Sequence, residues 1–174
     1  IQVFCGSYLP GWRPERDYRG TSSAGKDAGG GVLLDLSHEL DYVQWLAGPL
    51  KVEHAVNEKV SDLEIDSDDL LLVSGRTEKG AHVHIGLNYF TRKSTRRILI
   101  DGNGISIQGD FIANSLSQVV DGEPSEFSWP NLSRNDTYRA QHLAVLKGDV
   151  NKVCSFEEGL NTMRLIEGIR TWQN

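Results

Sequence analysis

Cysteine and methionine are rare in this chain of 174 residues, which contains two cysteines and one methionine. Cys5 and Cys154 lie far apart in the sequence. Small domains that depend on disulfides contain closely spaced cysteines in even sets, so we expect no disulfide framework here. Two isolated thiols are typical of a reducing compartment, and the sequence therefore predicts a cytoplasmic protein.

Long hydrophobic runs and an excess of positive charge are missing as well. No apolar run approaches the roughly 20 residues that a membrane-spanning helix needs. The 24 acidic residues outnumber the 18 basic ones and give a net charge of −6. This balance argues against a protein that coats nucleic acid. We expect neither a membrane nor a nucleic acid as a partner.

Sequence motifs for binding a dinucleotide or a metal are also missing. Gly102 and Gly104 do not form a dinucleotide fingerprint, because the third glycine position is Ile107 and no helix follows in the pattern. His82 and His84 share one face of an expected strand, but no carboxylate or cysteine stands nearby at the spacing of metal ligands. The sequence predicts no metal site.

The start of the chain indicates a piece of a longer protein. The first residue is Ile1 rather than methionine, and an alternating pattern typical of a strand begins at once. A natural N-terminus more often begins with a frayed polar segment. The alternative is an N-terminus left by processing or by removal of a tag.

The hydrophobic pattern predicts an α+β domain with an open, mainly antiparallel sheet and helices on one face. The expected strands cover residues 1–8, 52–60, 70–76, 82–90, 96–101, 105–109 and 111–120. The expected helices cover residues 31–47, 134–148 and 156–172. A polar loop over residues 9–30 and an acidic, solvated connection over residues 62–69 lie between them. Alternation in one strand puts Val83, Ile85, Leu87 and Tyr89 on the core side.

The helix expected over residues 31–47 contains the first candidate site. Asp35, His38 and Tyr42 stand at positions i, i+3 and i+7, beside the apolar stripe. A carboxylate next to an imidazole holds the ring in place and supports its charged form, which suits a general acid or base. The alternative is an ordinary exposed helix face. The preceding glycines, residues 29–31, could let a ligand approach the free N–H groups of the helix.

The long polar loop contains the second candidate site. Arginine recognises carboxylate or phosphate with two parallel hydrogen bonds, and aromatic rings stack on sugars or bases. The candidate residues of this loop are Trp12, Arg13, Arg16, Tyr18 and Arg19. A solvated loop is the alternative. A further basic cluster over residues 92–97 could bind phosphate, although most charge runs of this kind are solvated.

The segment Gly29 to Gly48, GGGVLLDLSHELDYVQWLAG, resembles the signature helix of the Gfo/Idh/MocA oxidoreductases, the family of glucose–fructose oxidoreductase and inositol dehydrogenase. The similarity extends to residues 155–170 and so covers nearly the whole chain. Members of this family join an N-terminal Rossmann domain, which binds NAD(P), to a C-terminal sheet domain that contacts the substrate. Residues 1–174 resemble that C-terminal domain, without the Rossmann domain.

The family usually places three residues between its catalytic Asp and His, whereas two residues separate Asp35 from His38. His38 keeps the spacing of the family to Asp41. On a regular helix, one residue fewer rotates His38 by about 100° relative to its usual position. The spacing therefore weakens the assignment of Asp35 more than that of His38.

The resemblance implies the substrate-binding half of an NAD(P)-dependent oxidoreductase that acts on a sugar. It implies that His38 moves a proton, that Asp35 orients His38, and that Tyr42 and the loop residues hold the substrate. NAD or NADP would be bound mainly by the Rossmann domain, so this fragment alone would be inactive. Residues 6–19 are similar to a subgroup of bacterial surface-sugar biosynthesis, which implies a nucleotide-linked or acidic sugar.

The open face of the sheet predicts a homodimer or a larger oligomer. Two other functions remain open. The chain could be a non-catalytic ligand-binding or scaffold module with the same fold, or a small-molecule sensor domain.

Overall fold

A computed structural model describes residues 1–172, which form one mixed sheet of eight strands and four α-helices. The strands are β1 (Gln2–Tyr8), β2 (Leu50–Glu58), β3 (Leu70–Thr77), β4 (His82–Asn88), β5 (Phe90–Gly102), β6 (Ile105–Asp110), β7 (Ser115–Val120) and β8 (Glu123–Ser128). The helices are α1 (Val32–Asp35), α2 (Ser37–Ala47), α3 (Arg134–Lys147) and α4 (Phe156–Arg170). Three short 3₁₀ turns, η1 (Leu9–Gly11), η2 (Tyr18–Gly20) and η3 (Ser22–Ala24), shape the long polar loop.

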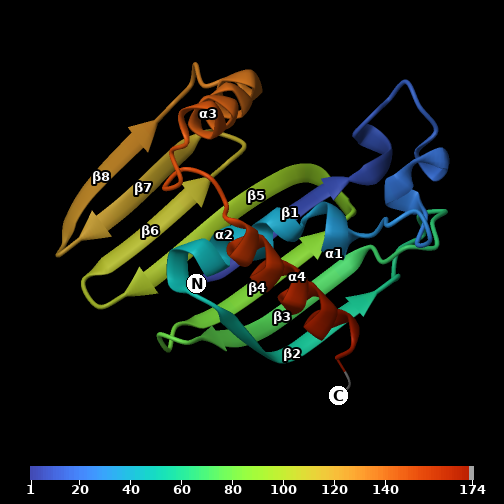
Figure 1. Ribbon diagram of the computed structural model, residues 1–174, viewed down its shortest axis with the longest axis horizontal. Coiled ribbons are helices and arrows are strands. Elements are labelled where there is room, and N and C mark those ends of the chain that lie inside the picture. Colours follow the sequence, from blue (N-terminus) through green and yellow to red (C-terminus); the bar gives the residue numbers. More distant parts are fainter. Residues whose placement is uncertain (173–174) are drawn as a thin grey trace.

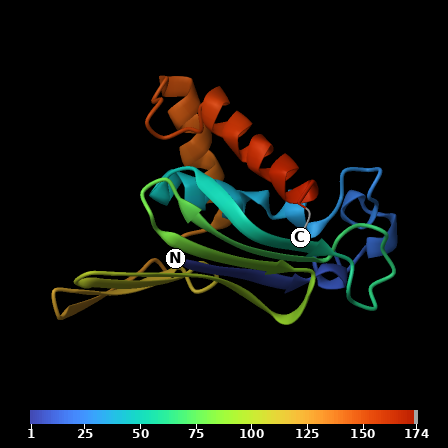
Figure 2. The ribbon, with the colours of Figure 1, turned by 90° about the horizontal axis from the view of Figure 1, so that it is seen from below.

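The strand order is β2-β3-β4-β1-β5-β6-β7-β8 (Figure 1). Within the described residues, β1 and β4 run parallel and all other neighbours run antiparallel. The helices lie on one face of the sheet, and the described part of the chain leaves the opposite face uncovered (Figure 2). The predicted fold class, an α+β domain with a mainly antiparallel open sheet, is confirmed. No helix within residues 1–172 is both long and apolar enough to cross a membrane.

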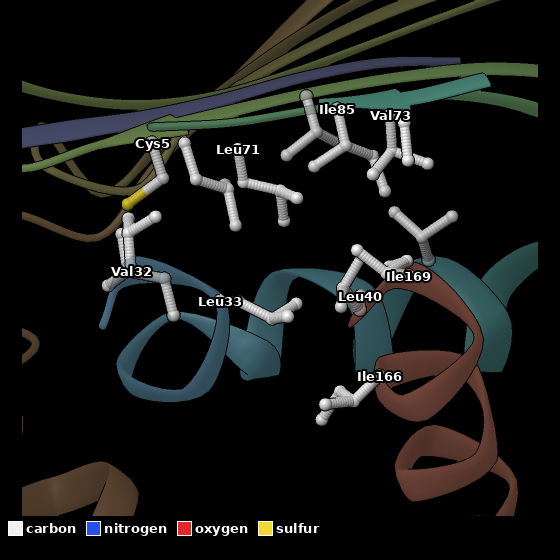
Figure 3. Packing of buried hydrophobic residues seen from close by; sticks show 14 of the residues in the cluster. Cys5, Val32, Leu33, Leu40, Leu71, Val73, Ile85, Ile166 and Ile169 are labelled. Atoms are coloured by element: carbon white, nitrogen blue, oxygen red, sulfur yellow. The ribbon is translucent and has the colours of Figure 1, made fainter. Parts of the chain in front are cut away.

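The core lies between the sheet and helices α1, α2 and α4 (Figure 3). The alternation predicted for β4 is confirmed, because Val83, Ile85 and Leu87 are fully buried while His82 and His84 are exposed on the opposite face. Apolar side chains from the sheet meet side chains from the three helices. The sheet contributes Cys5, Leu71, Val73 and Ile85, and the helices contribute Val32, Leu33, Leu40, Ile166 and Ile169. Full burial of each large aliphatic side chain stabilises the fold by about 1.5–3 kcal/mol.

The helix expected over residues 31–47 is two helices in the structure. Leu36 interrupts it with φ −107° and ψ 19°, a conformation outside the helical region. Because the helical rotation is broken there, residues before and after Leu36 do not share a face as they would on one regular helix. The spacing argument that paired Asp35 with His38 therefore does not apply.

The acidic connection over residues 62–69 is not solvated at its end, in contrast to the prediction. Asp69 is fully buried, and its carboxylate accepts hydrogen bonds from the backbone N–H groups of Val60 and Ser61. The Asp68 carboxylate accepts a hydrogen bond of 2.9 Å from the backbone N–H of Leu33. Both carboxylates satisfy donors that would otherwise be buried without a partner, which is why these charges lie inside.

Two further differences concern the far end of the sheet. The strand expected over residues 111–120 begins only at Ser115, after a turn in which Asn114 has φ 50°. Strand β8 was not predicted, because it is mostly exposed and contains Pro124 and two glutamates rather than an alternating apolar pattern. Proline is tolerated in strands mainly at a sheet edge, where β8 lies.

Candidate functional site

Gly30 and Gly31, at the end of the glycine-rich segment before α1, are packed too tightly for a side chain. A Cβ atom on Gly30 would lie 2.1 Å from the Ser22 carbonyl oxygen, and one on Gly31 would lie 2.2 Å from the Asp68 carboxylate. Gly31 also has φ 114°, which disfavours other residues. The Asp68 carboxylate occupies the start of α1 through the Leu33 N–H group. The expected approach of a ligand to free N–H groups at this point is therefore wrong.

Asp35 is held by an aromatic residue of the core rather than by His38. The Tyr89 hydroxyl donates a hydrogen bond of 2.7 Å to Asp35 Oδ2. Burial raises the pKa of Tyr89, and the Asp35 carboxylate raises it further, so this hydroxyl stays protonated and remains a donor. The Trp12 ring meets Tyr89 edge to face at 5.3 Å, and Trp12 Nε1 donates to Ser7 Oγ at 2.7 Å.

Asp35 shares one cavity of about 250 Å³ with three of the predicted loop residues. This cavity, which we call the Asp35 cavity, is lined by Leu9, Trp12, Arg13, Tyr18, Thr21, Ser22, Ser23 and Asp35. It combines a carboxylate, a guanidinium group, hydroxyl groups and an aromatic surface. Such a combination can recognise a small ligand that has several hydroxyl groups.

Arg16 and Arg19 lie outside the Asp35 cavity. The guanidinium group of Arg19 forms ion pairs with Asp17 at 2.8 Å and with Glu64 at 3.0 Å. Hydrogen bonds from Arg19 lower the pKa of Asp17. Arg19 therefore stabilises the loop itself, and the structure does not bring it together with the residues of the cavity.

His38 is paired with Glu39, a residue that the spacing argument overlooked. His38 Nε2 lies 3.1 Å from Glu39 Oε1, and Arg96 Nε donates to the same oxygen at 2.6 Å. Within residues 1–172, no hydrogen bond or ion pair connects Asp35 with His38. The predicted orientation of His38 by Asp35 is wrong, because the break at Leu36 separates the two residues.

Glu39 is fully buried and ionised. Burial alone would raise the pKa of Glu39, but the hydrogen bond from His38 and the charge of Arg96 outweigh it and hold that pKa below its ordinary value. A carboxylate can only accept, so Nε2 is the nitrogen through which His38 donates to Glu39. The sequence contains a signal for this arrangement, since Glu39 is a charged residue on the apolar stripe between Leu36 and Val43.

Tyr42 belongs to the surroundings of Glu39 and not to the Asp35 cavity. Within the described residues, neither Tyr42 Oη nor Glu39 Oε2 has a hydrogen-bond partner of normal geometry. Burial raises the pKa of Tyr42, and the charge of Glu39 raises it further. The Phe111 ring lies 5.6 Å from the Tyr42 ring. The Arg96 guanidinium group lies 4.8 Å from the centre of the Phe111 ring.

His38 borders a second cavity, of about 870 Å³, between α2, β5 and α3. Arg96, Arg134, Tyr138 and Lys152 also line it. We call it the cationic cavity. The structure thus divides the predicted site residues between two cavities, with Asp35 on one and His38 on the other. No group of three or more His, Cys, Asp or Glu side chains within residues 1–172 is arranged to hold a metal ion.

Comparison with known proteins points to one family and one fold. A family model described as the GFO/IDH/MocA C-terminal domain matches residues 1–108. No curated protein matches the chain. A solved structure of levoglucosan dehydrogenase in complex with NADH has a TM-score of 0.81 at 16% identity, and the match covers 97% of this chain and 54% of that chain.

Two other solved structures give similar matches. UDP-N-acetylglucosamine 3-dehydrogenase GnnA from Acidithiobacillus ferrooxidans has a TM-score of 0.72 at 16% identity, over 97% of this chain and 51% of that chain. KijD10, a 3-ketoreductase from Actinomadura kijaniata in complex with NADP and TDP-benzene, has a TM-score of 0.68 at 17% identity, over 98% of this chain and 53% of that chain. The chain therefore spans about half the length of these proteins and shares their fold.

Proposed function

Because the chain belongs to the GFO/IDH/MocA C-terminal domain family, we propose that it is the substrate-binding half of an NAD(P)-dependent oxidoreductase acting on a sugar or sugar derivative. The observation that supports this proposal most directly is the Asp35 cavity. Its carboxylate, guanidinium and aromatic groups are those that recognise a sugar ring and its hydroxyl groups. One similar structure is named for UDP-N-acetylglucosamine, and another contains TDP-benzene, so a nucleotide-linked sugar is the substrate class to test first.

The glycine-rich segment before α1 does not fit the pyrophosphate of a nicotinamide dinucleotide. A pyrophosphate is usually held by free N–H groups at a helix start after a glycine-rich turn. In the described residues the glycine-rich start of α1 is closed by the Asp68 carboxylate, which would repel a phosphate. We therefore propose that NAD or NADP binds to a Rossmann domain elsewhere in the full protein, and that residues 1–174 form its C-terminal substrate domain.

The residues of the two cavities would have separate tasks. Asp35, fixed by the Tyr89 hydroxyl, accepts hydrogen bonds from sugar hydroxyl groups, while Arg13 donates to the ring substituents. His38 acts as the general acid or base through Nδ1, since Nε2 is engaged by Glu39. Glu39 takes over the orienting task that the sequence assigned to Asp35.

The test uses the full-length protein with NAD or NADP and a panel of nucleotide-linked, acidic and neutral sugars. Formation or consumption of the reduced nicotinamide is followed by its absorbance. Replacement of Arg13 by alanine should raise KM by about 10- to 100-fold, because a hydrogen bond from a charged group contributes about 1.5–3 kcal/mol. The matched control is Arg16→Ala, which removes an arginine of the same loop outside the cavity.

The alternative is a ligand-binding or scaffold module that has the same fold but no redox activity. The coding sequence upstream of Ile1 separates the two readings. A strand, a Gly-x-Gly-x-x-Gly turn and a helix there would support the oxidoreductase, whereas turnover of no sugar by a full-length protein that binds its cofactor would contradict it.

We also propose that the open sheet face forms an oligomer and that the protein acts in the cytoplasm. Phe4, Leu72 and Leu99 are exposed on this face and border a shallow cavity of about 440 Å³. An exposed apolar surface of this kind is typical of a protein interface. The free cysteines support a reducing compartment. A monomer in light scattering over a wide concentration range would contradict the oligomer.

A further inference from the structure

The cationic cavity has an electrostatic character opposite to that of the whole chain. Its lining includes Arg96 from β5, Arg134 from α3 and Lys152 from the segment between α3 and α4, together with His38. Among the described residues, no carboxylate lines it. The chain as a whole has a net charge of −6. Glu39 and Asp149 compensate part of the charge of Arg96 and Lys152, whereas Arg134 forms no ion pair within residues 1–172, so the cavity keeps a positive charge that attracts anions.

Each of the three cations keeps hydrogen-bond donors for a ligand. Arg134 forms no ion pair within residues 1–172. Its guanidinium group lies 5.8 Å from the centre of the Tyr138 ring and donates one hydrogen bond of 3.5 Å to the Tyr138 hydroxyl, which leaves its other N–H groups for a ligand. Arg96 uses Nε for Glu39, so its two terminal nitrogens remain free of that contact. Lys152 pairs with Asp149 at 3.0 Å but is largely exposed, and exposed pairs of this kind exchange readily.

The cavity is open to solvent and has room for an anion larger than a single carboxylate. Its volume of about 870 Å³ is several times that of the Asp35 cavity, at about 250 Å³. Sites for small molecules and cofactors usually have volumes of about 300–1,000 Å³. A phosphate or diphosphate has the charge to use two or three cations at once, since arginine binds phosphate oxygens with paired hydrogen bonds.

We propose that the cationic cavity binds the phosphate or diphosphate group of the substrate. This inference rests on the proposed function and specifies its substrate class as a phosphorylated or nucleotide-linked sugar. His38 borders the same cavity, so an anion held by Arg134 and Arg96 places the adjoining sugar carbon next to His38. The hydroxyl groups of the sugar can then extend toward Asp35, which lies on the other side of the break at Leu36.

The first experiment measures binding alone, so it does not depend on turnover. Calorimetric titration of the full-length protein with inorganic pyrophosphate and with uridine diphosphate is compared between the wild type and Arg134→Ala. Removal of a guanidinium group that binds phosphate should lower the affinity for both ligands by about tenfold. The control is Arg139→Ala, which removes an arginine of the same helix that does not line the cavity. Higher ionic strength should weaken binding to the wild type more than binding to Arg134→Ala.

Parallel titration with NADP⁺ identifies the molecule to which the phosphate belongs. If Arg134→Ala lowers the affinity for uridine diphosphate and leaves the affinity for NADP⁺ unchanged, the cavity recognises the substrate. The proposal would be overturned if the wild type and Arg134→Ala bound pyrophosphate and uridine diphosphate with equal affinity. It would also be overturned if Arg134→Ala lost affinity for NADP⁺ alone. Binding that depends on Arg134 in a protein without dehydrogenase activity would support the anion site while contradicting the proposed reaction, so the two failures are distinguishable.

Discussion

Replacement of the buried Glu39 by glutamine tests the ion network around His38 most directly. Glutamine keeps the shape of the side chain and one acceptor oxygen but removes the negative charge that Arg96 and His38 share. Hydrogen bonds to charged groups contribute about 1.5–3 kcal/mol each. The side chains of Arg96 and His38 are 33% and 48% exposed, so water can replace part of the lost interaction. We therefore expect a loss of about 1–2 kcal/mol in the free energy of unfolding at neutral pH.

The same argument fixes the pH dependence of this effect. The folded protein lowers the pKa of Glu39 below its ordinary value of 4.5. Stabilisation by Glu39 is therefore fully present above pH 4.5 and is lost as the pH falls through the lowered folded-state pKa. Since glutamine does not titrate, the difference in stability between the wild type and Glu39→Gln should shrink as the medium becomes more acidic. Other carboxylates titrate alike in both proteins and cancel in this difference.

The assay is denaturant and thermal unfolding of both proteins between neutral pH and about pH 3. At neutral pH the loss should lower Tm by about 2–8 °C. The control is Glu53→Gln, because Glu53 pairs with Arg76 at 3.2 Å while both side chains are about half exposed. An exposed pair contributes at most about 1 kcal/mol, and we expect a change of less than about 0.5 kcal/mol. A Glu39→Gln protein as stable as the wild type at neutral pH, or a difference that stays constant into acid, would refute the reasoning.

Three further results are expected. Gly31→Ala should destabilise the fold by at least about 2 kcal/mol, because Gly31 has φ 114° and its Cβ would lie 2.2 Å from the Asp68 carboxylate. The control is Gly11→Ala, whose Cβ would meet no atom within 4 Å, and thermal unfolding compares the two variants. Iodoacetamide should label the exposed Cys154 in the native protein and Cys5 only after denaturation, because Cys5 is buried and burial raises its pKa to about 12. Mass spectrometry of the peptides measures the labelling, and early labelling of Cys5 in the native protein would contradict this prediction. In the full-length protein His38→Ala should lower kcat by about 10²-fold, and unchanged turnover with an intact circular-dichroism spectrum would remove His38 from the acid–base role.

The elements that the sequence predicts well are those with a strong local pattern. The alternation of β4 appears as expected, because it depends on neighbours within a few residues. The loop residues Trp12 and Arg13 line the Asp35 cavity, and their role in binding a substrate stays a prediction.

The rest of the site depends on contacts between distant parts of the chain. Glu39 binds Arg96 across 57 residues, and no helical spacing can show such a pair. Asp35 is fixed by Tyr89, which lies 54 residues away. The break at Leu36 occurs in an apolar segment without proline, and its sequence contains no local signal for an interruption. Tertiary packing rather than propensity therefore decides which carboxylate faces the imidazole.

The position of β1 in the sheet has a consequence for the way the chain folds. Strands β4 and β5 follow one another in sequence, yet β1 is inserted between them, with Gln2 paired to both His84 and Leu99. Strand β1 is synthesised about 80 residues before its partner strands, and such distant pairing slows folding. Until β1 arrives, β4 and β5 expose open edges that can pair with each other or with another chain. Loss of residues 1–8 would thus leave two smaller sheets, β2-β3-β4 and β5-β6-β7-β8, with a new aggregation-prone edge on each.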